Sequence, residues 1–139
     1  MTRYVLIPVV AGGIATGMMT LVLWIIDRTG WTRADMVRAI GSLFTKNYQN
    51  ALWPGLVTHF TAGIIFSGIY LHILSLLNLP SFIGVIFVGG VIGFIQGFAF
   101  SFIMVIMAEH HPIEEFQEAD FEVAVAHVLG HIVYGMAIG

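Results

Sequence analysis

The run SFIGVIFVGGVIGFIQGFAFSFIMVIMA, residues 81–108, determines how this 139-residue chain folds. It contains no charged side chain, and as a helix rising about 1.5 Å per residue it is long enough to cross a hydrocarbon core of about 30 Å. The whole chain is 58% hydrophobic and 9% charged, whereas a soluble domain carries about 25% charged residues. We therefore expect an integral membrane protein. The formal net charge of −3 excludes a nucleic-acid binder, which needs a basic excess.

Three other apolar runs lie at about residues 4–26, 54–77 and 119–139. Backbone amides and carbonyls cannot stay unpaired in lipid, so each run is predicted to be a helix. The first run is too long for the core of a secretory signal, and we expect it to be retained. The sequence thus predicts an all-α polytopic membrane protein, a four-transmembrane-helix bundle forming a single membrane domain over residues 1–139. The short Leu79–Pro80 link predicts an antiparallel hairpin of the second and third helices.

The loop between the first two runs is predicted to contain a short helix. Thr32 to Asp35 fits a capping box, and the residues after it place apolar side chains at helical spacing. We expect a helix over about residues 32–45 that lies in the membrane interface, with Trp31 as an anchor.

Charged side chains gather on one side of the predicted bundle. With four spans the first and third loops share a side, and the first loop carries four of the five basic residues: Arg28, Arg33, Arg38 and Lys46. The third loop carries six acidic residues and no basic one. Because Lys and Arg set membrane orientation whereas acids contribute little, loops 1 and 3 are predicted to be cytoplasmic and both termini outside.

Glycines recur four residues apart within three of the runs: Gly13–Gly17, Gly89–Gly93–Gly97 and Gly135–Gly139. This spacing lets helix backbones approach closely in lipid, so we expect contacts there within the bundle or with another subunit. No glycine-rich segment joins a strand to a helix ahead of a Lys-Ser/Thr pair, so no nucleotide cofactor is expected. The absence of cysteine excludes a disulfide framework and any Cys-ligated zinc or iron–sulfur cluster.

Histidines carry the candidate chemistry. Of six, five are expected on the side of the two charged loops: His59, His110, His111, His127 and His131. The last two are four residues apart, so their side chains stack on one helix face about 5–6 Å apart. Asp120 and Tyr134 extend this polar stripe, which must face the bundle interior, a cavity or a partner, because lipid disfavours it.

Two histidines one turn apart on a helix suit a transition metal ion such as zinc, copper or iron. The candidate metal ligands are His127, His131, His110, His111, Glu109 and His59. His110 and His111 point about 100° apart, so we expect only one of them at the site. Asp120 or Tyr134 would orient a ligand through a hydrogen bond.

Two other interpretations of the histidines stay open. A haem would take His59 and His127 as axial ligands, since both are expected about 8–12 Å deep in the membrane. Alternatively, the histidines are hydrogen-bonded structural residues or a pH-sensitive polar seam. Neither an H-E-x-x-H motif nor a nucleophile–base pair is present, so by motif the chain is not an autonomous enzyme.

The second run carries H-F-x-x-G-x-x-F-x-x-x-Y, from His59 to Tyr70, and the fourth carries G-H-x-x-Y-G, from Gly130 to Gly135. Together with the glycine-rich first and third runs, these motifs resemble a family of uncharacterised small prokaryotic four-helix membrane proteins, a domain of unknown function. The resemblance implies a prokaryotic cell membrane and a shared framework that includes His59 and His131, with no activity attached. His127 and the Glu109–Pro112 string depart from the family pattern.

The leading hypothesis is a small integral membrane subunit of a larger membrane complex with redox or metal-dependent chemistry. Its contribution would be a His-rich transition-metal site at the cytoplasmic side. The alternatives are a metal-ion or proton transporter or channel with a histidine-lined path, and a purely structural scaffold subunit. The expected partners are the lipid bilayer and either other membrane subunits or further copies of the chain, with no nucleic acid.

Overall fold

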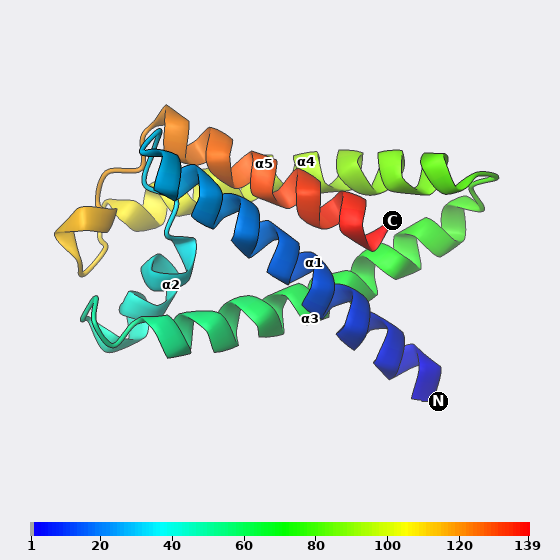
Figure 1. Cartoon of the computed structure of the whole chain (residues 1–139), viewed down its shortest axis with the longest axis horizontal. Helices are drawn as coiled ribbons and strands as arrows, with labels where there is room; N and C mark the ends of the chain where they lie inside the picture. Colours follow the sequence, from blue (N-terminus) through cyan, green and yellow to red (C-terminus); the bar gives the residue numbers. More distant parts are fainter. Residues whose placement is uncertain (1) are drawn as a thin grey trace.

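The computed structural model describes the backbone of residues 2–139 and the side chains of residues 5–139. Over this range it contains four long helices, one short helix and a single 3-10 turn (Figure 1). The elements are α1 (Thr2–Thr29), α2 (Met36–Thr45), α3 (Leu52–Leu77), α4 (Phe82–Ala108), η1 (Glu114–Phe116) and α5 (Phe121–Ile138). The four long helices are apolar and long enough to cross a membrane. The predicted all-α fold, with four candidate spans and a short helix between the first two, is confirmed.

The two charged loops lie at the same end of the bundle. The loop that holds α2 and the loop that holds η1 are together there, whereas the α3–α4 link lies at the opposite end (Figure 1). We call the former the α2 end. Arg33 joins the two loops by donating from Nη1 to the carbonyl oxygen of Glu115, at 3.3 Å. Among the described side chains the only ion pair joins Arg38 to Asp35, so opposite charges of the two loops do not pair directly. Which side of the membrane the α2 end faces stays a prediction.

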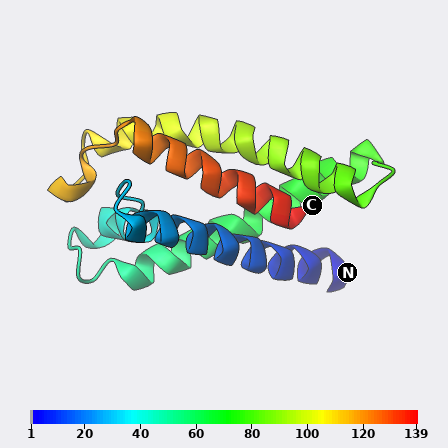
Figure 2. The same ribbon diagram turned by 45° about the horizontal axis from the view of Figure 1, so that its top comes forward.

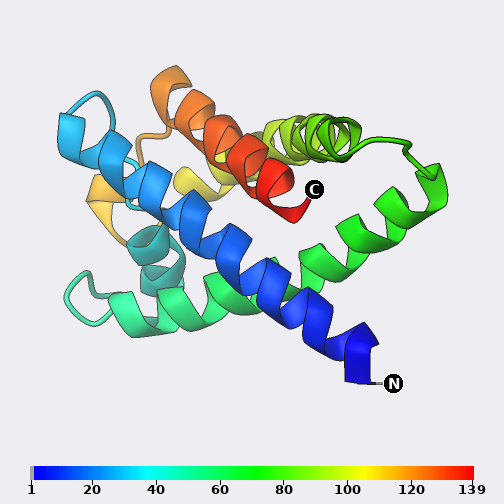
Figure 3. The same ribbon diagram turned by 45° about the vertical axis from the view of Figure 1, so that its right-hand side comes forward.

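The long helices form two layers. Figure 2 shows α4 beside α5 in one layer and α1 beside α3 in the other, and α1 also packs against α5. The chain neighbours α3 and α4 diverge from their link and contact each other little (Figure 3). The predicted hairpin is therefore antiparallel but open, because each of its helices packs mainly on a different partner.

Glycines set the contact between α4 and α5. A Cβ atom on Gly89 would lie 2.3 Å from the carbonyl oxygen of Gly135, and one on Gly93 would lie 2.2 Å from the carbonyl oxygen of His131. A Cβ on Gly139 would meet the carbonyl oxygen of Val85 at 2.5 Å. Only glycine permits backbones this close, so the close helix contact predicted from the glycine spacing of α4 and α5 is present.

The glycine pair predicted for the first helix does not make such a contact. A Cβ atom on Gly13 or Gly17 would meet no atom within 4 Å. Gly12 faces α3 instead, where its Cβ would lie 2.7 Å from the Oγ of Ser67. Because successive residues on a helix point about 100° apart, the neighbouring position faces the partner helix while Gly13 turns away from it.

The short helix α2 begins later than predicted. Asp35, rather than Thr32, is the N-cap residue, and its Oδ1 accepts a hydrogen bond from the amide of Arg38 at 3.1 Å. The predicted capping box at Thr32 is therefore wrong, since the backbone turns into the helix only at Met36. The helix packs directly on the start of α3, where a Cβ on Gly41 would lie 1.8 Å from the carbonyl oxygen of Ala51.

Candidate functional site

His127 and His131 form a buried pair on α5. Each side chain is 9% exposed, and their Nε2 atoms lie 3.2 Å apart. The spacing of four residues stacks the two rings on one face of the helix, with ring centroids 4.7 Å apart. The ring of Phe100, on α4, stacks against His131 at 5.6 Å. These contacts hold both imidazoles inside the bundle and away from lipid.

A cavity of about 120 Å³ opens beside this pair. All four long helices and α2 border it. Its polar lining consists of Thr16, Thr58, His59, Gln96, His127, His131 and Tyr134. His59 lies seven residues into α3 and His127 six residues into α5, which places both about 10 Å from the α2 ends of their helices. Three histidines from two helices therefore border one cavity in the same half of the bundle.

Buried polar atoms without a hydrogen-bond partner are concentrated at this cavity. Within the described part of the chain they are Thr16 Oγ1, His59 Nε2, His127 Nδ1 and His131 Nδ1, and all four residues line the cavity. Buried polar groups in native proteins are almost always paired, so each unpaired group points to a function or to a bound water or ion. We call this cavity with its three histidines the histidine cavity.

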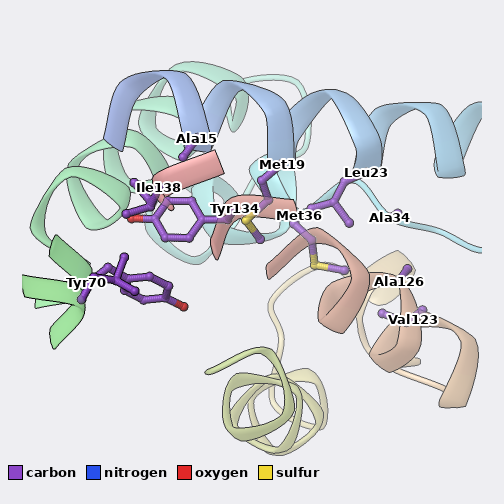
Figure 4. Close-up of a cluster of buried hydrophobic side chains, with 11 residues drawn as sticks. Ala15, Met19, Leu23, Ala34, Met36, Tyr70, Val123, Ala126, Tyr134 and Ile138 are labelled. Atoms are coloured by element: carbon purple, nitrogen blue, oxygen red, sulfur yellow. The ribbon is translucent and has the colours of Figure 1, made fainter. Parts of the chain in front are cut away.

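Two tyrosines lie farther from the α2 end than the three histidines, and one of them, Tyr134, lines the histidine cavity. Tyr134 on α5 donates its hydroxyl to the carbonyl oxygen of Gly63, and Tyr70 on α3 donates to Oε1 of Gln96. The two tyrosine rings meet edge to face at 5.4 Å (Figure 4). Tyr134 thus joins α5 to α3, which fixes the helix that carries two of the histidines against the helix that carries the third.

The remaining candidate ligands lie elsewhere. Glu109 and His110 are exposed just after α4. His111 is buried, but its Nε2 donates to the carbonyl oxygen of Ala39 at 3.0 Å and its Nδ1 accepts from the amide of Ile113 at 3.1 Å. Both of its ring nitrogens are therefore occupied by backbone groups. Glu109 and His110 thus lie apart from the histidine pair, whereas His111 lines a second cavity, of about 360 Å³, that His127 also borders.

Asp120 also has a different role from the one predicted. Its Oδ1 accepts a hydrogen bond from the amide of Val123 at 2.9 Å and so caps the start of α5. Tyr134 does line the histidine cavity, although its hydroxyl bonds to Gly63 rather than to a histidine.

The residues that line the site but were not candidate site residues in the sequence include Met19, Gln96 and Phe100. A lone amide such as Gln96 inside an apolar span is a signal of an interior position, because lipid disfavours it. Met19 and Phe100 carry no such signal, since an apolar side chain in a span faces lipid or protein equally well.

Geometry limits what the site can bind. Two nitrogen ligands of one tetrahedral ion, with metal–nitrogen distances of about 2.0–2.1 Å, are separated by about 3.3 Å. The observed Nε2–Nε2 separation of 3.2 Å is compatible with a shared ion, and also with one imidazole donating to the other. Among the described residues no group of three or more His, Asp or Glu side chains is close enough to hold a metal ion without rearrangement. The pair is therefore preformed, whereas a third ligand has to move.

The fold defines the class of this chain: it is an integral membrane protein with four candidate spans. No protein-family model matches it, and no curated protein or solved structure is significantly similar to it. The resemblance to the small four-helix family is thus confirmed only as far as the apolar four-helix architecture.

Proposed function

We propose that this protein is a small integral membrane subunit that holds a transition metal ion in the histidine cavity. The observation that carries the proposal is the buried pair of Nε2 atoms of His127 and His131, 3.2 Å apart and beside a third imidazole, His59, whose Nε2 has no partner. With both pair nitrogens in the unprotonated form, their lone pairs bind one ion, and His59 is the third imidazole at the same cavity.

A single ion fits the volume of the histidine cavity, and a porphyrin does not. Cofactor sites typically measure about 300–1,000 Å³, against about 120 Å³ here. An ion path across the bundle is also less favoured, because Gln96, which lines the cavity, is held in a hydrogen bond by Tyr70. We therefore propose a metal site rather than a haem site or an ion channel.

The proposed role within a larger membrane complex follows from what the cavity lacks. Its described lining supplies ligands but neither a carboxylate nor a thiol, and chemistry at such a site depends on groups supplied by a partner. We propose that the α2 end faces the cytoplasm, because its loop carries four of the five basic residues.

Metal analysis of the protein purified in mild detergent tests the proposal. The wild type is loaded separately with zinc, copper and iron salts, passed over a desalting column and analysed by mass spectrometry. We expect one equivalent of at least one metal in the wild type, and none in a His127→Ala/His131→Ala variant. His72→Ala is the control, because His72 is exposed and lies toward the opposite end of α3.

Circular dichroism checks that the double variant keeps its helices. A folded double variant that retains the metal, or a wild type that binds none of the three, overturns the proposal.

A further inference from the structure

The lining of the histidine cavity includes a methionine that the proposed function does not use. Met19, on α1, is 3% exposed and lines the cavity together with the three histidines. Its Cγ lies 3.3 Å from the position of a Cβ atom on Gly130, the residue just before His131. Glycine at this position lets the methionine lie against α5 next to the histidine pair (Figure 4 shows Met19 between α1 and Tyr134).

The described lining of the histidine cavity carries no negative charge. Its possible donor atoms are imidazole nitrogens, the Met19 thioether, the Gln96 amide oxygen and hydroxyl groups. An ion bound there keeps its full charge in a medium of low dielectric constant. The desolvation penalty grows with the square of the charge, so it is about four times larger for a divalent than for a monovalent ion.

The chemistry of the available ligands also favours a monovalent ion. Thioether sulfur is a soft ligand that selects Cu(I), and imidazole also binds copper, whereas hard divalent ions prefer carboxylate and carbonyl oxygen. Two imidazoles and one thioether, all neutral, suit a soft ion with a single positive charge.

We propose that the ion of the histidine cavity is Cu(I), bound by Nε2 of His127, Nε2 of His131 and the sulfur of Met19. This inference rests on the proposed function, since it names the ion of the same site. Among the seven methionines of the chain, Met19 is thereby a metal ligand rather than a lipid-facing or packing residue.

Competition titrations under anaerobic, reducing conditions test the assignment. Cu(I) is titrated against a bicinchoninate-type chelator and Zn(II) against a zinc-binding dye, using the full chain in detergent. We expect the wild type to bind Cu(I) more tightly than Zn(II). Met19→Leu nearly conserves side-chain volume and so preserves the fold, but it removes the sulfur. We expect it to weaken Cu(I) binding by at least as much as the loss of an outer-shell partner, about 10–100-fold.

The neighbouring methionine provides the control. Met18 is 47% exposed on the outer face of α1, so Met18→Leu should leave Cu(I) binding unchanged. X-ray absorption of the copper-loaded wild type should show a copper–sulfur distance that disappears in Met19→Leu and persists in Met18→Leu.

The outcomes separate the two proposals. If Zn(II) binds more tightly than Cu(I), or Met19→Leu leaves Cu(I) affinity and the sulfur signal intact, the copper assignment is wrong while the metal site stands. If neither ion binds, the metal site itself is wrong and the copper assignment falls with it.

Discussion

Replacing Gly93 by alanine should increase the distance between α4 and α5 and destabilise their contact. The new Cβ would lie 2.2 Å from the carbonyl oxygen of His131, whereas an ordinary contact begins at 3.4 Å. The deficit of about 1.2 Å cannot be relieved by a side chain, because the opposing atom belongs to a helix backbone. Overpacking of this kind costs about 1–3 kcal/mol. We therefore expect the free energy of unfolding of Gly93→Ala to be lower by that amount than that of a Gly→Ala variant without a clash.

Gly17→Ala is the control that separates the effect of the α4–α5 contact from the effect of helix propensity. A Cβ atom there meets nothing within 4 Å, so alanine adds no clash. It removes the flexibility of glycine in a helix, which favours alanine by about 0.5–1 kcal/mol. Gly17→Ala should therefore be neutral or slightly stabilising. Both variants gain the helix propensity of alanine, so the difference between them is the overpacking cost alone, about 1–3 kcal/mol.

Unfolding by a rising mole fraction of sodium dodecyl sulfate, starting from mild detergent micelles, provides the measurement. Circular dichroism follows the loss of structure, and refolding on dilution establishes that the transition is reversible. If Gly93→Ala and Gly17→Ala unfold at the same midpoint, then α4 and α5 are not in backbone contact at this position.

Two further variants test local features of the α2 end. Asp35→Ala removes the side-chain cap of α2 and should lower the stability of this helix by about 1 kcal/mol, seen as faster amide hydrogen exchange in its first turn. Thr32→Ala is the control and should leave that exchange unchanged. If only Thr32→Ala speeds the exchange, Thr32 is the cap, as predicted from the sequence. His111→Ala removes the hydrogen bonds to Ala39 and Ile113 and should expose the α4–α5 loop to faster proteolysis without changing metal content. A loss of metal from this variant with an unaltered loop would instead make His111 a ligand.

Hydropathy predicted the spans because about 20 consecutive apolar residues have few other uses in a protein. It could not predict which face of each span meets protein, since lipid-facing and protein-facing side chains are equally apolar. Glycine spacing correctly predicted the close helix contact at Gly89 and Gly93, where glycine-containing α5 packs against them. It failed for Gly13 and Gly17, because the same spacing on α1 faces away from its neighbours.

The sequence likewise predicted the end of the bundle at which the histidines lie, but not their neighbours. The sequence placed five of them at one end, but it could not show that α3 and α4 diverge there. Because of that divergence and the end of α4 at Ala108, His110 is exposed and His111 forms a hydrogen bond with the backbone of α2. His59 borders the cavity because α3 packs beside α1, a contact between segments far apart in the chain.

The packing of α1 against α5 also has a consequence for biosynthesis. Leu23 and Met19 on α1 lie against Gly130, about 110 residues later in the chain. At a translation rate of about 5–20 residues per second, α1 waits about 5–20 s in the membrane before its partner emerges. During this interval the face of α1 that carries Met19 and Leu23 is without its final neighbour. Both histidines of the pair arrive with α5, so premature termination before this helix leaves a membrane-inserted chain that lacks the histidine pair.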